Sequence, residues 1–461
     1  ETLKNYDKAL ADYNKGIMLN PGDPDLYFEK AYLYHIYLNK PDLAIENYLK
    51  VAERDPENSL TFNNIGKVYE DLDKDYNKAL EYYTKAIEID STNSSAYRNR
   101  ANLYAKKFNE PDKAEKDFSQ AITLAPEDSD NYYYRAYFYQ ITLKNYDKAL
   151  ADLNKGIELN SEDSDLYYGK AYIYDNYLSK PALALENYLK VTDMDPENSM
   201  AVNNIALIYS NYIKDYNKAL EYYTKAIEID STNPLAYKNR AILYVDKLNE
   251  LDKAEKDFSQ AIAVAIEDSD IYYHYRGNFY RENLKNYDKS IADYKKGIEL
   301  NPYGNPWFYL NLVNIYIKNL NEPDKALIVL LKLIDLEKKY KFLKDTEIIT
   351  DIADIYLKEF KDAKKALKYY QKEIDNKPNS YFGYLKLAEY YAFHEINDKK
   401  AVFNYEKSLE LEPNNNNTNL SFINYNFSKD NYTEVIELTK KMIDLEPKDP
   451  QGDYLTALLY L

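Results

Sequence analysis

The chain has 461 residues, with 77 acidic and 60 basic side chains, which gives a formal net charge of −17 at pH 7. It contains no cysteine, three histidines and only 10 glycines. This composition excludes disulfides, cysteine-ligated metal centres and thiolate catalysis, and it argues against glycine-rich phosphate-binding loops. The acidic balance also argues against a nucleic-acid binder, which needs a basic surface.

Membrane and targeting signals are not evident in the sequence. The longest apolar stretch, near residues 326–334, is broken by Lys332 and is far shorter than the roughly 20 residues of a spanning helix. The first residues form no apolar signal-peptide core. We therefore expect no membrane span. The lack of cysteine fits the cytoplasm, the periplasm and the cell surface equally, and among these we favour the cytoplasm.

A small residue recurs along the whole chain at a nearly constant step. The steps are 35 residues seven times, then 36, 36, 40, 35 and 34. The series is Ala9, Ala44, Ala79, Ala114, Ala149, Ala184, Ala219, Ala254, Ser290, Ala326, Ala366, Ala401 and Val435. The step of 40 residues predicts a helix that is lengthened near residues 331–343.

Each unit is predicted to contain two helices. Tyr97, Ala101 and Tyr104 recur at positions i, i+4 and i+7, which is one face of a helix. After a break, Ala114 and Phe118 lie on one face of a second helix. The tyrosine at the position of Tyr104 recurs ten residues before almost every small residue of the series. We therefore expect Tyr104 to be buried between its two helices and the next repeat.

These units resemble the tetratricopeptide repeat. The matching residues of one unit are Tyr97, Ala101, Tyr104, Ala114, Phe118, Ala121 and Pro126. The resemblance covers essentially the whole chain in about thirteen units, but the loop between the helices is one residue longer than in the family's 34-residue pattern. It implies an all-α fold, a right-handed α-solenoid of antiparallel helix pairs. Sel1-like repeats also lengthen this loop, but they are rich in glycine and remain the alternative.

A larger period lies above the single repeat. Residues 74–93 are identical to residues 214–233, so a block of four repeats, 140 residues long, is duplicated. The sequence therefore divides into a four-repeat block at 1–140, its copy at 141–280, and divergent repeats at 281–461 that continue the same solenoid. The chain begins in a second helix and ends in a first helix, so we expect it to be cut from a longer array.

Candidate chemistry is sparse. The spacing of Asp71, Asp73 and Asp75 is similar to that of a calcium loop, but Tyr76 stands where that loop needs glycine and Tyr82 where it needs a bidentate glutamate. The three histidines lie at unmatched positions, and the carboxylates are interpreted as solvated helix faces. We therefore predict no catalytic residue, no metal site and no cofactor.

The resemblance implies that certain first-helix residues line a concave groove, those three before and one after the small residue. At these positions the chain places aromatic pairs: Phe28 and Tyr32, Tyr133 and Tyr137, and Tyr168 and Tyr172. The last two pairs come from adjacent repeats, so we expect them to be neighbours. Because they lie outside the core pattern, we expect that their removal leaves the fold intact. The competing interpretation is compositional bias, since the chain has 54 tyrosines.

A polar strip occupies the same groove positions between the aromatic pairs. It comprises Asn63, Lys67, Arg98 and Asn102, and the duplicated block contributes Asn203 and Lys238. Arg98 and Asn102 match part of the clamp with which chaperone-binding relatives hold a terminal carboxylate. Tyr134, Asp165 and Gly169 depart from that clamp, so we do not predict it.

The sequence therefore predicts a non-enzymatic scaffold for protein–protein interaction that binds an extended peptide or a helix in its groove. The predicted partner is a protein or peptide that is basic or that carries proline or aromatic side chains, and not nucleic acid. Two alternatives stay open. The first is that the array is the recognition arm of a larger enzyme. The second is that it is a surface array that binds glycans or associates with itself.

Overall fold

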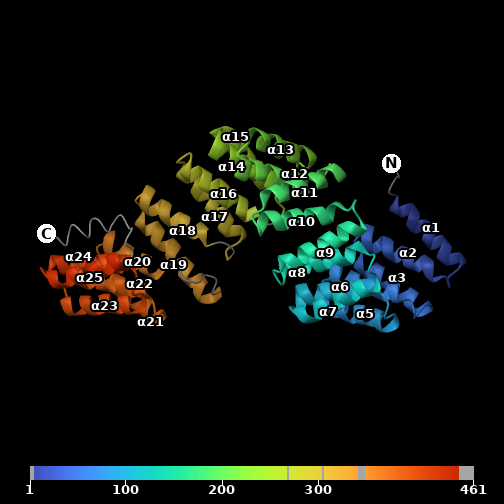
Figure 1. The fold of residues 1–461 in the computed structure, drawn as a ribbon, viewed down its shortest axis with the longest axis horizontal. Helices are drawn as coiled ribbons and strands as arrows, with labels where there is room; N and C mark the ends of the chain where they lie inside the picture. Colours follow the sequence, from blue (N-terminus) through green and yellow to red (C-terminus); the bar gives the residue numbers. More distant parts are fainter. Residues whose placement is uncertain (1–4, 267–268, 304–305, 341–347, 446–461) are drawn as a thin grey trace. The chain divides into compact units, whose positions relative to one another are not determined.

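The computed structural model describes residues 5–266, 269–303, 306–340 and 348–445. Within these ranges every regular element is a helix, and 25 α-helices are present, which fits about thirteen helix pairs. The chain divides into two compact units, Glu1–Lys247 and Leu248–Leu461. Figure 1 shows the helices of the chain, coloured from the N-terminus to the C-terminus. The division between the units falls inside the sequence block 141–280, and the three-block division of the sequence stays a prediction.

The first unit consists of helices joined by short turns, in which each helix packs against its neighbours along the chain. Its α-helices are α1 (Tyr6–Leu19), α2 (Pro24–Tyr32), α3 (Pro41–Arg54), α4 (Ser59–Val68), α5 (Tyr76–Ile89), α6 (Ser94–Leu103), α7 (Pro111–Leu124), α8 (Ser129–Ile141), α9 (Tyr146–Leu159), α10 (Ser164–Asn176), α11 (Pro181–Met194), α12 (Ser199–Ile208), α13 (Tyr216–Ile229) and α14 (Pro234–Leu243). Five π-helical turns end first helices, namely η1 (Leu33–Tyr37), η2 (Tyr69–Asp73), η3 (Tyr104–Phe108), η4 (Tyr209–Ile213) and η5 (Tyr244–Leu248).

The second unit repeats this pattern. Its elements are α15 (Leu251–Val264), α16 (Ser269–Glu282), α17 (Tyr287–Leu300), α18 (Trp307–Asn314), the π-helical turn η6 (Ile315–Asn319), α19 (Pro323–Tyr340), α20 (Ile348–Lys358), α21 (Ala363–Asn376), α22 (Tyr381–Phe393), α23 (Asp398–Leu411), α24 (Asn416–Ser428) and α25 (Tyr432–Leu445). Helix α19 has 18 residues where most second helices have 14. This agrees with the predicted lengthening as far as residue 340, and residues 341–343 lie outside the described part of the chain.

Local sequence signals start these helices. Side chains of asparagine and aspartate at the N-cap accept a hydrogen bond from the first turn, as Asn145 Oδ1 does from the Lys148 amide at 3.1 Å. Proline stands at the first position of several second helices, such as Pro111 in α7, where no backbone donor is needed. The all-α solenoid of antiparallel helix pairs that the sequence predicts is confirmed.

The turn between the two helices of a repeat has a constant backbone conformation. One residue there has a positive φ, and none of these residues is glycine: Asn39, Lys74, Asn109, Lys144, Ser179, Lys214, Asn249, Lys285, Asn321, Lys361, Ile396 and Asp430. The following backbone N–H often reaches back to the tyrosine of the first helix, as in Glu110 N to Tyr104 O at 3.0 Å. The extra residue of these repeats therefore lies in an ordered, wide turn and not in a free loop.

The core of each repeat follows the small-residue series. From Ala44 to Ala401 every member of that series is fully buried. The residue four positions further along the second helix is buried as well: Tyr48, Tyr83, Phe118, Leu153, Tyr188, Tyr223, Phe258, Tyr294, Leu330, Tyr370 and Tyr405 are at most 3% exposed. Small residues allow the paired helices to approach closely, and the large ones fill the space against the next pair.

The expectation that Tyr104 is buried is wrong. Tyr104 is half-buried, and its ring lies edge-on to Phe108 with the Lys113 amine 5.2 Å from the ring centroid. Phe118 on α7 and Leu103 on α6 take the fully buried places. Tyr104 is the first residue of the π-helical turn η3, and no residue of that turn is fully buried.

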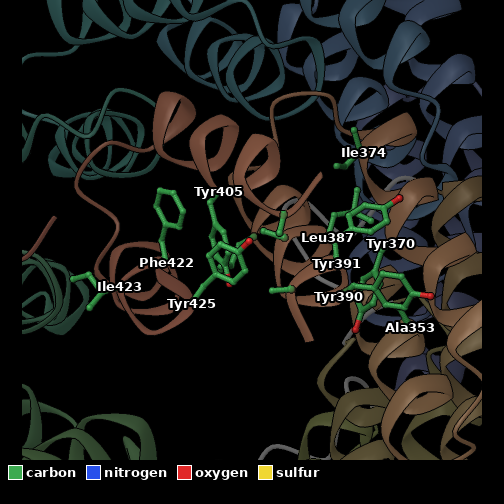
Figure 2. Close-up of a cluster of buried hydrophobic side chains, with 14 of the residues drawn as sticks. Ala353, Tyr370, Ile374, Leu387, Tyr390, Tyr391, Tyr405, Phe422, Ile423 and Tyr425 are labelled. Atoms are coloured by element: carbon green, nitrogen blue, oxygen red, sulfur yellow. The ribbon is translucent and has the colours of Figure 1, made fainter. Parts of the chain in front are cut away.

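The second unit has the same organisation, and its core also contains clustered aromatic side chains. Figure 2 shows buried side chains from α20 to α24, among them Tyr370, Tyr405, Phe422 and Tyr425. The rings of Tyr405 and Phe422 are stacked with centroids 4.7 Å apart, and Tyr425 lies 5.7 Å from Tyr405. These contacts join successive helix pairs, as expected where each repeat is stabilised mainly by its neighbours.

Candidate functional site

A cavity of about 230 Å³ opens in the first unit between α8, α9 and α10. It is lined by Tyr133, Ala136, Tyr137, Gln140, Ile141, Leu153, Tyr168, Gly169 and Tyr172. We call this cavity the tyrosine pocket. Its lining comes from two successive repeats, so the pocket exists only because one helix pair stacks on the next.

The four tyrosines of the pocket come in two pairs from two first helices. Tyr133 and Tyr137 are one turn apart on α8, and Tyr168 and Tyr172 are one turn apart on α10, so each pair shares a helix face. The rings of Tyr168 and Tyr172 lie nearly parallel with centroids 6.4 Å apart. The sequence analysis expected these two pairs to be neighbours, and the structure places all four in one cavity.

Two contacts hold Tyr168 in place. The Asn204 side-chain amide on α12 donates to the Tyr168 hydroxyl at 3.2 Å and to the Tyr188 hydroxyl at 3.1 Å. The ring of Tyr168 also meets that of Tyr188 edge-on, with centroids 5.6 Å apart. Tyr133 and Tyr168 are half-buried and pack against core clusters. These two tyrosines therefore also support the fold, which the sequence analysis did not expect.

Tyr137 is the most open of the four. Its side chain is 41% exposed, and the Lys106 amine lies 5.1 Å from its ring centroid. Substitution of Tyr137 therefore removes a wall of the pocket while leaving the core clusters untouched.

Gly169 lines the pocket beside Leu153. A Cβ atom at this position would meet Leu153 Cδ2 at 3.2 Å, so a larger side chain would crowd Leu153, which itself lines the pocket. Other repeats place asparagine there, as at Asn64 and Asn204. In the sequence, Gly169 stands out only as a departure from the clamp pattern, although a lone glycine in a helix-face series indicates the close approach of a neighbouring side chain.

Two carboxylates accompany the tyrosines of α10. Burial raises the pKa of Asp175, and burial together with the neighbouring Asp163 raises the pKa of Asp165. Burial and the charge of Asp165 raise the pKa of Tyr133 to about 12. The pKa of Tyr172 is also raised, chiefly by burial and to a smaller extent by Asp175. Carboxylates therefore lie near Tyr133 and Tyr172, while the Lys106 amine lies at Tyr137.

The first aromatic pair has a similar setting on α2. Phe28 meets Tyr48 edge-on at 5.4 Å, as Tyr168 meets Tyr188, and Tyr32 is 40% exposed. In this copy Glu29 stands at the position of Gly169. The duplication therefore preserves the aromatic contacts but not the glycine of the pocket lining.

The polar strip is engaged in contacts between repeats. The Asn99 amide donates to Asn63 Oδ1 at 2.9 Å, and Asn239 donates to Asn203 Oδ1 at 3.0 Å in the duplicated block. Asn63 and Asn203 are at most 3% exposed. These asparagines link adjacent first helices and are not open to a ligand.

Arg98 is likewise held by the next repeat. Its Nη1 donates to Asp128 Oδ2 and to Asn131 Oδ1, each at 3.0 Å, at the start of α8. Asn102 is buried, and Lys67 and Lys238 are half-buried, with burial lowering the pKa of the Lys238 amine. The strip that the sequence analysis offered as a binding surface is thus largely part of the packing.

Asp71 of the calcium-like spacing faces His35, whose Nε2 lies 3.7 Å from Asp71 Oδ2. Across the described ranges, no group of side chains is arranged to hold a metal ion. No described helix is both long and apolar enough to cross a membrane.

Comparison with known families agrees with the fold. Two sequence models of the tetratricopeptide repeat match the chain, one at residues 24–58, 61–93, 129–163, 201–233 and 271–303, and the other at 82–116 and 222–256. The chain contains tetratricopeptide repeats. Such repeats indicate an interaction scaffold for protein or peptide partners, a class that is generally not enzymatic.

Several solved structures match this chain over different shares of its length. YrrB, described as having an unusual peptide-binding site, is 28% identical over 42% of this chain and 97% of its own, with a TM-score of 0.33. A Parabacteroides merdae tetratricopeptide repeat protein is 20% identical over 58% and 98%, with a TM-score of 0.42. Yeast Tom70 is 18% identical over 89% and 96%, with a TM-score of 0.37. A search of curated proteins gave no match.

Proposed function

We propose that this protein is a non-catalytic scaffold that binds an extended peptide segment of a partner protein across the tyrosine pocket. The observation that carries the proposal is the pocket itself, in which four tyrosines from two repeats surround one apolar cavity. Tyrosine offers a large, stiff contact area at a low entropic cost of ordering, which suits a binding surface.

The way in which the pocket tyrosines are held supports this role. These tyrosines are held by the core on one side, because Asn204 and Tyr188 fix Tyr168. On the other side Tyr137 stays open to solvent. A pre-formed wall with one exposed edge lets a peptide side chain enter with little rearrangement of the protein.

The polar strip does not carry the proposal. Arg98 already pairs with Asp128, so a partner carboxylate would have to displace an existing contact between repeats. We therefore place the main contact at the tyrosines and not at the strip.

The test starts from a phage-displayed library of random peptides selected on the full chain. Selected peptides are synthesised, and their Kd is measured with the unmodified protein and with the variants Tyr137→Ala and Gly169→Asn. We expect both variants to weaken binding about tenfold or more, which corresponds to roughly 1.4 kcal/mol. Tyr212→Ala is the matched control, because Tyr212 is 48% exposed and is not part of the pocket lining.

Thermal melts followed by circular dichroism show whether each variant keeps its fold. If the selected peptides bind all variants equally, the pocket is not the binding site. If no peptide is selected, but a glycan array or concentration-dependent light scattering gives a positive result that Tyr137→Ala abolishes, the surface serves glycan binding or self-association and the proposal is wrong.

A further inference from the structure

We propose that the tyrosine pocket accepts a basic side chain, lysine or arginine, of the bound peptide. This inference rests on the function proposed above and specifies the chemistry that the pocket reads. It follows from the order of side chains along α10, the lining of the cavity and a comparison with the duplicated copy.

One face of α10 combines aromatic rings with carboxylates. Asp165, Tyr168, Tyr172 and Asp175 follow one another at spacings of three, four and three residues, so they lie along one side of the helix. The middle two line the pocket, and the two carboxylates flank them. A ligand that enters between the rings therefore has a negative charge within reach on either side.

Among the described residues, none forms a hydrogen bond or ion pair with the side chain of Asp165 or Asp175. Asp175 is half-buried, and burial raises its pKa without an opposing positive charge. A half-buried carboxylate without a counter-charge is costly, and a cation from a partner would remove that cost.

The aromatic lining of the pocket also favours a positively charged ligand. The face of a tyrosine ring attracts an ammonium or guanidinium group within about 6 Å of its centroid. The Lys106 amine already lies 5.1 Å from the Tyr137 ring, so this wall of the pocket attracts a cation of the chain itself. Four rings with apolar walls from Ile141 and Leu153 also suit the aliphatic stem of lysine or arginine.

Other classes of side chain fit less well. An acidic side chain would be repelled by the negative charges of Asp165 and Asp175, which flank the pocket tyrosines on α10. An apolar side chain would fill the cavity but would further bury Asp175 without neutralising it. A basic side chain satisfies both the rings and the carboxylates.

The duplicated block supplies an internal comparison. In the first copy, Glu29 replaces Gly169 and His35 replaces Asp175. His35 is 6% exposed and faces Asp71, so this copy has neither the glycine of the pocket lining nor the unpaired carboxylate. The features that specify a cation are thus confined to the second copy.

The experiment uses two small probes on the full chain, N-acetyl-arginine amide and its uncharged isostere N-acetyl-citrulline amide. Binding is measured by saturation-transfer NMR titration at fixed ionic strength. We expect the arginine probe to bind about tenfold more tightly than the citrulline probe. We expect Gly169→Asn to abolish this binding and Asp175→Asn to weaken it about threefold to tenfold.

Asp193→Asn is the control, because it changes the net charge of the chain equally but concerns an exposed residue outside the pocket lining. It should leave the affinity for the arginine probe unchanged. Equal affinity for both probes overturns the inference, and so does arginine binding that Gly169→Asn does not reduce. Thermal melts exclude misfolding, and Tyr137→Ala tests the same pocket through a residue outside the core clusters.

The two proposals can fail separately. Peptides that depend on the pocket but carry no basic residue would uphold the scaffold function and overturn the cation inference. Pocket-dependent arginine binding without any selected peptide would uphold the cation site and overturn the peptide function.

Discussion

The guanidinium group of Arg135 holds both carboxylate oxygens of Asp152. On α8, Arg135 Nε donates to Asp152 Oδ2 and Nη2 donates to Oδ1, each at 2.7 Å, while Nη1 reaches the Ser119 hydroxyl of the preceding repeat at 3.4 Å. The same fork joins Arg100 to Asp117 in the neighbouring repeat. A charge-assisted pair of this geometry ties the two helices of one repeat to each other and to the helix before them.

Breaking this pair is expected to destabilise the first unit. Asp152→Ala leaves the Arg135 guanidinium, 19% exposed, without its counter-charge, and loss of one partner of a buried pair costs about 3 kcal/mol. Urea unfolding of the full chain, with hydrogen exchange of residues 129–159, measures this loss.

The next repeat has a natural replacement for this Arg–Asp pair. In the next repeat the same two positions hold Lys170 and Asn187, and Asn187 bonds instead to the Leu183 carbonyl at 2.8 Å. The double change Arg135→Lys with Asp152→Asn should therefore regain most of the stability that Asp152→Ala loses. A double variant as unstable as the single one would show that the two positions act independently.

The fourth position after the small residue should be the energetic anchor of a repeat. Phe118→Ala removes a fully buried ring and is expected to cost about 3–5 kcal/mol locally. Tyr104→Ala should cost clearly less, because Tyr104 is half-buried. Hydrogen exchange over residues 94–124 compares the two, and a larger loss of protection in Tyr104→Ala than in Phe118→Ala would reverse the assignment.

Ile396 occupies a backbone conformation that suits it poorly. It has φ of 50° in the turn between α22 and α23, and its side chain is 70% exposed. A β-branched residue in the left-handed region is strained by about 1–2 kcal/mol. Ile396→Asn should therefore raise the free energy of unfolding of the second unit by about 1 kcal/mol, measured by chemical denaturation.

The reverse change in the first unit is the matched control. Asn109 has φ of 53° at the equivalent turn, so Asn109→Ile should lower stability by a similar amount. If both substitutions leave the unfolding midpoints where they were, the turn tolerates either residue and the strain argument is wrong.

Glu70 should make the first unit less stable as the pH rises. Its carboxylate accepts the Tyr83 hydroxyl at 2.7 Å, and burial, reinforced by Asp71, raises its pKa above the ordinary value of 4.5 despite Lys67 and Lys106 nearby. The folded protein then binds more protons at this site than the unfolded chain does. Its free energy of unfolding falls as the pH rises from 4.5 through the folded pKa.

Glu70→Gln removes this titration and keeps an acceptor for Tyr83. The stability difference between the variant and the unmodified protein should therefore grow in favour of the variant between pH 4.5 and 7. Denaturation midpoints at several pH values measure it. A difference that is constant over that range would show that Glu70 has an ordinary pKa in the folded protein.

The pattern of the sequence was sufficient for the helix pairs and most of the core. The burial of Ala114 and Phe118 follows from their spacing, because the face of a helix is set by neighbours three and four residues away. The same local rule placed Tyr133 with Tyr137, and Tyr168 with Tyr172, on shared faces.

Only the tertiary structure decided what those faces do. Arg98 is paired with Asp128 at the start of the next repeat, Tyr104 stays half-buried beside Phe108, and a pocket opens between α8, α9 and α10. Each outcome depends on side chains from another helix, often in the adjacent repeat. The periodicity of one helix determines which residues turn inward together, whereas pairing and empty space depend on the particular side chains that meet across the stack.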